Sequence, residues 1–543
     1  MSFRQAQDRG LIRRFIAVSA LVLLIGSCGP KGAVAPVTKT GGGSLSVGTL
    51  APGDLDPAKA TTQSALLMLR TACDGLVGLD PETGKPRPAL AKGWTFGKDS
   101  RSLVLDLRPK VKFVDDTPVD APAIREALSR VVRPATASPS ASLLSRIEGF
   151  QDVRSGQTSD LPGVTAVGIS SIAIRFSEPS SDMVSVLADP ALIPLSPKSV
   201  ERDAAVANSS PPCAGPYKFQ GVSDNSVTLT RATSSRSANV AFTESGHGAA
   251  DRIDFHLFAS IEEAFDAFKA GTVAVSQVPD SRLVEARSLK GYARRNTPEM
   301  TYLAFDVTKP ATADPRLRLA ISLALDRLVL IDAAFGDQRQ SATQWLPDET
   351  DRASVCSDSL HKIADTDRAK TIFASTGIDP AKSNLELIFD SSRISRLVAQ
   401  AIEVQVKDAI RIDLKLQPLD PGGFGTSLAG HSASGIWIVV NDPRLPVPDD
   451  RFGALVRSGS PRNTMSFSDA QVDADIDSAR AEVDPTRADV QWQQAENRIC
   501  QLMPGAPLWF GVRHWVFSDA VHSVGSTRLD LFGTPILRSA SRS

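Results

Sequence analysis

The sequence predicts a mixed α/β chain (α+β in the arrangement of its elements) that folds into several domains. Its 543 residues exceed what one hydrophobic core organises, and at about 100–200 residues per domain they indicate two to four domains. Apolar residues make up 42% and charged residues 22%, a globular composition that excludes a disordered or collagen-like chain. Strand patterns alternate with helix patterns, without the strict βαβ rhythm of a wholly parallel sheet.

The first 27 residues have the pattern of a secretory signal. Four arginines precede an apolar run at 15–25, which is too short to span a bilayer as a permanent helix. Small residues then stand directly before Cys28, which resembles the lipobox of bacterial lipoproteins and implies cleavage before Cys28 and its acylation. A plain signal peptide with a chance cysteine is the alternative. Residues 28–41 follow as a flexible tether, and we expect the body to lie on the extracytoplasmic face of the membrane, in the periplasm or cell envelope.

Apolar spacing predicts the next elements along the chain. Leucines two apart at 103–107 predict a buried strand, and the same spacing recurs at 172–176. Asp314-Pro315 supplies an N-cap acceptor and a first-turn proline, which predicts a helix with an apolar face from Leu317 to Leu328 and a stop at Gly336. A helix pair is expected from 468 to about 502, with a new start at Asp484-Pro485.

Composition and motifs argue against catalysis. Sixty Lys and Arg residues balance 61 Asp and Glu, so the basic excess of a nucleic-acid binder is absent. The sequence Gly430-His431-Ser432-Ala433-Ser434 misses the last glycine of a nucleophile elbow. Gly422-Gly423-Phe424-Gly425 is interpreted as a loop, because no Gly-Lys-Ser/Thr follows it. The six histidines show no metal-ligand spacing. We therefore expect a monomeric binding protein with no enzymatic activity, cofactor or metal.

Four cysteines remain after Cys28, namely Cys73, Cys213, Cys356 and Cys500. An even number in an exported chain indicates disulfides, and four cysteines allow three pairings. The residues alone do not choose between them, and buried free thiols are the alternative.

Short segments spread along nearly the whole mature chain, from about 42 to 520, together resemble the family 5 extracellular solute-binding proteins, the oligopeptide- and dipeptide-binding receptors of ABC importers. The resemblance lies in the order of the segments, since each is weak alone. The segments are Gly42-Gly43-Ser44-Leu45, Leu55-Asp56-Pro57, Cys73-Asp74-Gly75-Leu76-Val77, Asp80-Pro81-Glu82-Thr83-Gly84, Pro88-Ala89-Leu90-Ala91-Lys92-Gly93-Trp94, Leu107-Arg108-Pro109-Lys110-Val111-Lys112-Phe113, Thr117-Pro118-Val119, Cys213-Ala214-Gly215-Pro216-Tyr217-Lys218-Phe219, Asp314-Pro315-Arg316-Leu317-Arg318, Ala324-Leu325-Asp326-Arg327, Val472-Asp473 and Pro507-Leu508.

This resemblance implies a two-lobed periplasmic-binding-protein-like fold (type II, cluster C), with an extra domain on lobe one and a hinge that closes the lobes on a ligand. Lobe one is expected at 42–79, 200–300 and 521–543, the extra domain at 80–199, and lobe two at 301–520. The resemblance also places cysteines in pairs within each lobe, which implies the bridges Cys73–Cys213 and Cys356–Cys500.

The segment Ile436-Trp437-Ile438-Val439-Val440-Asn441-Asp442-Pro443 departs from the family in an informative way. Peptide-binding members carry an Asp that holds the ligand amine, and here either alignment of the segment puts a valine at that position. Three readings stay open: Asn441 or Asp442 binds the amine from a shifted loop; Asp74, Asp306 or Asp390 replaces it; or the ligand has no free amine. The alternative to the first reading is that Asp442 is only a turn residue before Pro443.

The resemblance implies further ligand contacts elsewhere in the chain. Trp437 would stack on a ligand, with a core position as the alternative. Phe305 and Asp306 would lie in the cleft or the hinge, and Arg444 would meet a ligand carboxylate, with a solvated arginine as the alternative. The remaining candidates are Trp345 and Asn463, in segments that approach the ligand in the family.

Taken together, the sequence predicts a lipid-anchored receptor that captures short peptides and delivers them to the permease subunits of an ABC importer. Two alternatives keep the fold: a regulatory or scaffolding lipoprotein, and a receptor for a non-peptide ligand such as haem.

Overall fold

The computed structural model describes residues 43–232, 249–336, 339–347, 356–430, 435–522 and 528–542. The predicted signal, Cys28 and its tether lie outside these residues, as does Ser432. Among the residues described, no helix combines the length and apolar character needed to cross a membrane.

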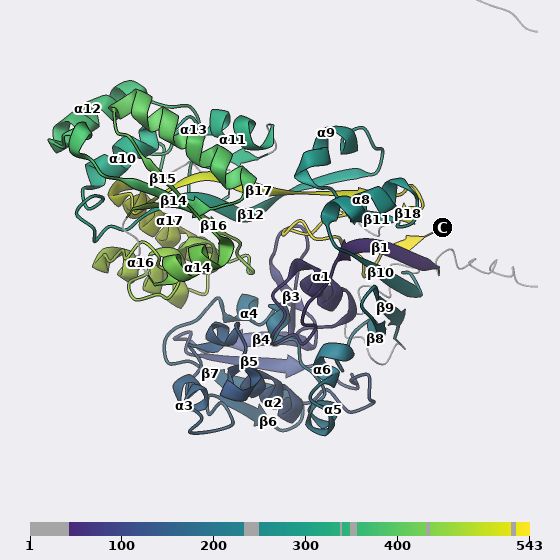
Figure 1. Cartoon of the computed structure of the whole chain (residues 1–543). Coiled ribbons are helices and arrows are strands. Elements are labelled where there is room, and N and C mark those ends of the chain that lie inside the picture. Colours follow the sequence, from purple (N-terminus) through teal and green to yellow (C-terminus); the bar gives the residue numbers. More distant parts are fainter. Residues whose placement is uncertain are drawn as a thin grey trace, which may run out of the picture. The chain divides into compact units, whose positions relative to one another are not determined.

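One large mixed sheet connects two lobes, which confirms the predicted fold class (Figure 1). Its strand order is β15-β14-β16-β12-β17-β11-β1-β10-β9-β8, with β13 paired to β17. The lobe-one strands are β1 (Ser44–Leu50), β8 (Tyr217–Val222), β9 (Ser226–Arg231), β10 (Arg252–Phe258) and β11 (Val275–Gln277). The strands of lobe two are β13 (Gln340–Ser341), β14 (Glu386–Asp390), β15 (Lys415–Leu419) and β16 (Ile436–Asn441).

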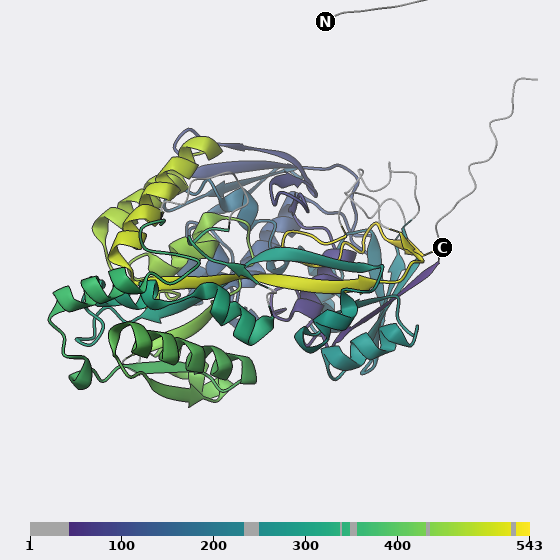
Figure 2. The same cartoon turned by 90° about the horizontal axis from the view of Figure 1, so that it is seen from above.

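Two long strands cross from one lobe to the other, β12 (Tyr292–Phe305) and β17 (Gly505–Phe517). They pair antiparallel with each other over most of their length and run side by side in both Figure 1 and Figure 2. β17 pairs with β11 in lobe one, while β12 pairs with β16 in lobe two. These two strands are therefore the covalent and hydrogen-bonded link between the lobes.

The extra domain has its own four-stranded antiparallel sheet in the order β4-β5-β7-β6. Its buried leucines alternate with an exposed Val104 on β5, so one sheet face packs inward and the other meets solvent. A separate hairpin, β2–β3, leads into the domain. The elements are β2 (Val77–Leu79), β3 (Pro86–Pro88), β4 (Ala91–Phe96), β5 (Ser102–Leu107), β6 (Val164–Val167), β7 (Ser171–Arg175), α2 (Ala121–Val132), α3 (Phe150–Arg154) and α4 (Met183–Val186).

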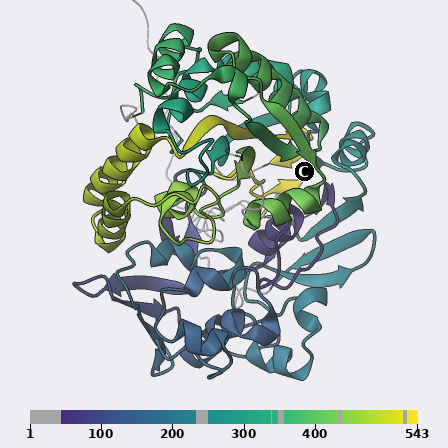
Figure 3. The same ribbon diagram turned by 60° about the vertical axis from the view of Figure 1, so that its left-hand side comes forward.

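Helices cover the large sheet in both lobes. Figure 3 shows the antiparallel pair formed by α16 and α17, the yellow-green helices of lobe two. Lobe one carries α1 (Gln63–Ala72), α5 (Pro197–Arg202), α6 (Val206–Ser209), α8 (Ile261–Lys269), α9 (Leu283–Ala286) and the short pair β18 (Val521–His522) and β19 (Ser541–Arg542). Lobe two carries α10 (Pro315–Ala324), α11 (Arg327–Phe335), α12 (Thr366–Thr376), α13 (Arg393–Ile410), α14 (Pro421–Ala429), α15 (Ala454–Val456), α16 (Ala470–Ala481) and α17 (Pro485–Leu502).

The helix expected from 315 to 336 is two helices, α10 and α11. Leu325 adopts an extended backbone after α10, and the Asp326 carboxylate then accepts a hydrogen bond from the Val329 amide and starts α11. The new start changes the helix face, so Leu328, expected to be buried, is 45% exposed. Gly336 ends α11 in a left-handed conformation, as predicted.

The helix pair near the C-terminus begins anew at Asp484, whose carboxylate caps α17, which confirms that prediction. The stretch at 422–425, by contrast, is not a loop. It lies in α14, because the Asp420 carboxylate caps the Gly423 amide and Pro421 occupies the first turn.

Three main hydrophobic clusters divide the described chain. One holds lobe-two residues between 300 and 510, one holds residues of 45–73, 193–275 and 515–540, and one holds the extra domain. The predicted boundaries between domains stay a prediction. Both disulfides that the resemblance implied are present, each within one lobe cluster: Cys73–Cys213 with a Cα–Cα distance of 5.6 Å, and Cys356–Cys500 with 5.4 Å.

The loop after β16 packs lobe two against the extra domain. Leu445 and Val447 belong to the hydrophobic core of the extra domain. Arg444 donates hydrogen bonds to the Ser140 hydroxyl and the Asp189 carboxylate, both at 2.7 Å. This loop is therefore a second connection between the two parts, besides the covalent chain.

Candidate ligand-binding site

Two cavities share an arginine of β17. The first, about 470 Å³, is lined by lobe-one residues 277–281, by Phe335, Arg339 and Arg393 of lobe two, and by the crossing strands. The second, about 380 Å³, lies at the carboxyl end of β1 and the start of α1. Both are lined by Ile261, Gln277 and Arg513. We call these two cavities together the crossing-strand cleft.

Arg513 interrupts the otherwise mostly apolar strand β17 and carries the main cationic group shared by the two cavities. Its Nη2 lies 3.3 Å from Glu299 Oε2 and 3.2 Å from Asp442 Oδ2. The Arg513 and Glu299 side chains are 14% and 23% exposed, whereas Asp442 is 51% exposed. One guanidinium is therefore divided between two carboxylates from different elements, one of them open to solvent.

A bulge in β12 places Glu299 beside Arg513. Residues 297–299 stand opposite the single residue Gly511, because Asn296 pairs with Val512 and Met300 pairs with Phe510. A Cβ atom on Gly511 would lie 2.6 Å from the Thr297 hydroxyl, so a glycine is needed for this close approach. Burial raises the pKa of Glu299, while the charge of Arg513 opposes that rise.

His514 lines the first cavity next to Arg513. Its Nδ1 is 2.7 Å from the Tyr292 hydroxyl, and the two rings stack. Burial, with a further effect of Arg339, lowers the pKa of His514 to about 4. The imidazole is therefore neutral at physiological pH, and the positive charge of this cavity comes from its arginines, Arg339, Arg393 and Arg513.

Of the predicted ligand-binding residues, Asp442 contacts Arg513 of the crossing-strand cleft. Four others lie in the core of lobe two or cap its turns. Trp437 is 2% exposed and packs edge-on against Phe424, Trp345 is 1% exposed against Tyr302, and Phe305 is fully buried. The Asp306 carboxylate accepts hydrogen bonds from the amide and hydroxyl of Thr308.

The polar candidates in the loops of lobe two bind other parts of the protein. The Asn441 amide donates to the Arg451 carbonyl and accepts from Arg462, and Asn463 bonds to both backbone groups of Phe467. Arg444 reaches the extra domain as described above. For these residues, as for the buried ones, ligand contact stays a prediction.

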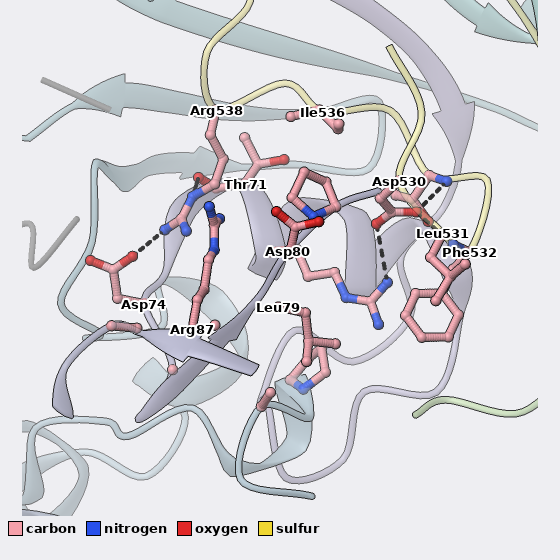
Figure 4. A pocket seen from close by; sticks show the side chains of 18 of the residues that line it. Thr71, Asp74, Leu79, Asp80, Arg87, Asp530, Leu531, Phe532, Ile536 and Arg538 are labelled. Atoms are coloured by element: carbon pink, nitrogen blue, oxygen red, sulfur yellow. Dashed lines mark hydrogen bonds and ion pairs between the residues drawn. The ribbon is translucent and has the colours of Figure 1, made fainter. Parts of the chain in front are cut away.

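The other carboxylates considered for a ligand amine are also engaged. Asp390 accepts hydrogen bonds from Ser392 and Ser395 at the start of α13. Asp74 lies in a different pocket, where it pairs with Arg538 at 2.5 Å (Figure 4).

Sequence reasoning missed Arg513 and Glu299. The sequence feature that could have identified Arg513 is its charge within the mostly apolar stretch 505–517. Glu299 has no such feature, because its position beside Arg513 depends on the bulge in β12. Among the described side chains, no group of three or more His, Cys, Asp or Glu could hold a metal ion.

Comparison with known proteins identifies relatives of this arrangement. The chain is 24% identical over 475 residues to the periplasmic murein peptide-binding protein MppA of Escherichia coli K12, covering 84% of this chain and 86% of MppA. It is equally similar, with the same coverage, to the probable deoxycholate-binding periplasmic protein YgiS of that organism. The crystal structure of the ABC transporter substrate-binding protein CtaP of Listeria monocytogenes has the same fold, with a TM-score of 0.76 at 19% identity over 92% of this chain and 99% of CtaP.

The profile of the bacterial extracellular solute-binding proteins, family 5, matches residues 85–456. This match covers more than half of the chain and includes the extra domain and much of lobe two. The chain therefore belongs to the family 5 bacterial extracellular solute-binding proteins.

Proposed function

We propose that this protein is the substrate-binding component of an ABC importer and captures short peptides in the crossing-strand cleft. The observation that carries the proposal is the position of Arg513, which lines both cavities and shares its charge between Glu299 and Asp442. The name of the relative MppA, a peptide-binding protein, supports the same ligand class. The chain itself makes and breaks no bond.

The ion pairs around Arg513 match the needs of a zwitterionic ligand. A peptide carboxylate entering the cleft can bind the Arg513 guanidinium in place of Asp442. The released Asp442 carboxylate, which is half exposed, is then available for the peptide amine. Glu299 is more buried and stays beside Arg513, so the cation keeps a partner before and after binding. The ligand thus replaces one internal ion pair with two ion pairs of its own.

Native mass spectrometry of residues 29–543, followed by denaturing analysis of released compounds, tests this proposal. We expect short peptides to be retained, and Arg513→Gln to weaken their binding by about 30-fold or more, because it removes a mostly buried charged partner. Arg487→Gln is the matched control, since Arg487 forms an exposed pair with Glu482 on the surface of lobe two. Equal retention in both variants, or no peptide from a tripeptide library, contradicts the proposal.

A ligand without an amine is the second candidate, and one residue favours it. When the segment is aligned on Trp437, Val440 stands where peptide-binding members carry Asp, and Val440 is an apolar side chain 57% exposed. The relative YgiS is named for deoxycholate, which has a carboxylate and no amine. Peptides acetylated at the amine separate the two candidates: acetylation should weaken binding at least tenfold if Asp442 holds the amine, and should change little otherwise.

We further propose that a lipid at Cys28 holds the mature protein at the outer face of the membrane, as a monomer beside its permease. Support comes from the small residues before Cys28 and from the glycine-rich segment after it. Mass analysis of the native N-terminus tests the anchor. An acylated Cys28 supports it, whereas an unmodified N-terminus at any residue overturns it.

A further inference from the structure

The first cavity of the crossing-strand cleft is lined by charged side chains of both signs, most of which already have partners. Arg339 of lobe two lies 3.4 Å from Asp280 of lobe one, and Arg513 lies 3.3 Å from Glu299. Two charged lining residues remain, Arg393 of α13 and Glu262 of α8. Among the described residues, neither of these two forms an ion pair. They come from different lobes, since α8 belongs to lobe one and α13 to lobe two (Figure 1).

The negative charge of Glu262 has a structural explanation. Glu262 lies in the first turn of α8, where the partial positive charge of the helix end favours a carboxylate. The Ser281 hydroxyl also donates a hydrogen bond to it, at 3.4 Å. The position of Glu262 in the cavity therefore needs no ligand to account for it.

Arg393 has the opposite relation to its helix. It is the first residue of the 18-residue helix α13, where the partial positive charge of the helix end disfavours a cation. The residue is exposed, and it lines the cavity from the side of lobe two. A carboxylate beside Arg393 would compensate both the guanidinium and the helix end. This position therefore suits an anion that the ligand supplies.

The cavity wall next to Arg393 is apolar. Ile394, the following residue of α13, lines the cavity together with Phe335 of α11. The Phe335 ring is held edge-on against Trp509, with ring centroids 5.5 Å apart. The methylene groups of a ligand side chain can pack on this wall while a terminal carboxylate reaches the arginine.

We propose that Arg393 binds a second carboxylate of the ligand, so that the cleft selects short peptides whose last residue has an acidic side chain. This inference rests on the proposed function, in which Arg513 holds the terminal carboxylate of a peptide. Arg513 and Arg393 line the same cavity, so a peptide held at Arg513 can extend its last side chain toward Arg393. Such a ligand contacts a crossing strand and lobe two at the same time.

Isothermal titration of residues 29–543 with the tripeptides Ala-Ala-Glu and Ala-Ala-Gln tests the inference. The two peptides have nearly the same shape and differ in one charge. We expect Ala-Ala-Glu to bind about fivefold more tightly, and this preference to shrink in about 0.5 M NaCl, because salt screens an exposed arginine. Arg393→Gln should reduce the preference to less than about twofold and leave the affinity for Ala-Ala-Gln unchanged. Arg396→Gln is the matched control, since Arg396 is an exposed arginine of the same helix that lines neither cavity.

A charge reversal gives a result that misfolding does not produce. Arg393→Glu should bind Ala-Ala-Gln more tightly than Ala-Ala-Glu, because the ligand carboxylate then meets a like charge. Equal affinity of the unchanged protein for the two peptides overturns this inference and leaves the proposed function standing. Binding of neither peptide overturns the proposed function and this inference with it. A preference for Ala-Ala-Glu that persists in both Arg393 variants also overturns the inference, because the second carboxylate then lies elsewhere.

Discussion

Replacing Arg444 with methionine should expose how strongly lobe two is held to the extra domain. Arg444 donates to Asp189 and Ser140 across this contact, and the Asp189 side chain is 0% exposed. Removing one partner of a buried ion pair costs about 3–5 kcal/mol, because the other charge stays buried. Arg444 is itself 28% exposed, and Asp189 keeps a hydrogen bond from the Ala191 amide, so we expect a loss below this range, about 2–3 kcal/mol at pH 7.

The pH dependence of this loss follows from Asp189. Burial already raises the pKa of Asp189, and the Arg444 charge opposes that rise. Without Arg444 the pKa of Asp189 rises further, so the native state holds its proton more tightly than the unfolded chain. The free energy of unfolding of the variant then falls as pH rises through the pKa of Asp189. The stability that the variant loses relative to the unchanged protein is therefore smaller near pH 4 than at pH 7.

Urea unfolding at pH 4.5 and pH 7 measures both effects, and native-state hydrogen exchange of residues 140–192 locates them. Asp189→Asn is the partner variant, since it removes the buried charge and keeps the shape. In the double variant, the loss at pH 7 should be smaller than the sum of the single losses by about 1–2 kcal/mol. A loss below about 0.5 kcal/mol at pH 7, or an equal loss at both pH values, refutes the reasoning.

Three further predictions concern stability. Replacing Cys356 and Cys500 with serine opens a loop of 144 residues and should lower lobe-two stability by about 3–5 kcal/mol, seen as a lower calorimetric transition of that lobe. The pKa of His514 is about 4, below its ordinary value of 6.5, so between these two pH values the unfolded chain binds more protons than the folded protein. The free energy of unfolding should therefore fall by about 2–3 kcal/mol as pH drops from 6.5 to 4. In urea titrations, His514→Gln should remove this dependence on pH. Gly291→Ala should lower the melting temperature by several degrees, because its Cβ would lie 1.7 Å from a carbonyl oxygen of β17, whereas Gly93→Ala, with nothing within 4 Å, should not.

Much of the fold follows from local signals in the sequence. Asp484 and Asp314 mark helix starts because a carboxylate before a proline satisfies the first amides of a helix, and the structure bears out both. The break at Asp326 was missed, because an apolar helical face continues through it and only the cap shows the new start. Local patterns therefore indicate elements well, and indicate their interruptions poorly when the hydrophobic pattern continues across them.

The candidate site could not be predicted in the same way. Arg513 becomes a partner of Glu299 only through the bulge opposite Gly511, and β12 and β17 are separated by about 200 residues of chain. Trp437 was predicted to stack on a ligand and Trp345 to line the cleft, but the same size that suits a ligand also suits a core, and both lie in the core. Pairing register, rather than residue type, decides which charges meet.

The valine at position 440, where peptide-binding members carry Asp when the segment is aligned on Trp437, also has a geometric consequence for ligand binding. Val440 and Asp442 are two residues apart at the end of β16, and both are more than half exposed. Two residues of an extended strand span about 6.6 Å, close to the length of two residues of an extended peptide. If Asp442 holds the amine in place of the residue at 440, a bound peptide lies displaced along the strand by about this distance, with its amine nearer to Arg513. The cationic charge of Arg513 then disfavours the amine unless a ligand carboxylate is also close, so the cleft should prefer short or side-chain carboxylated peptides over long neutral ones.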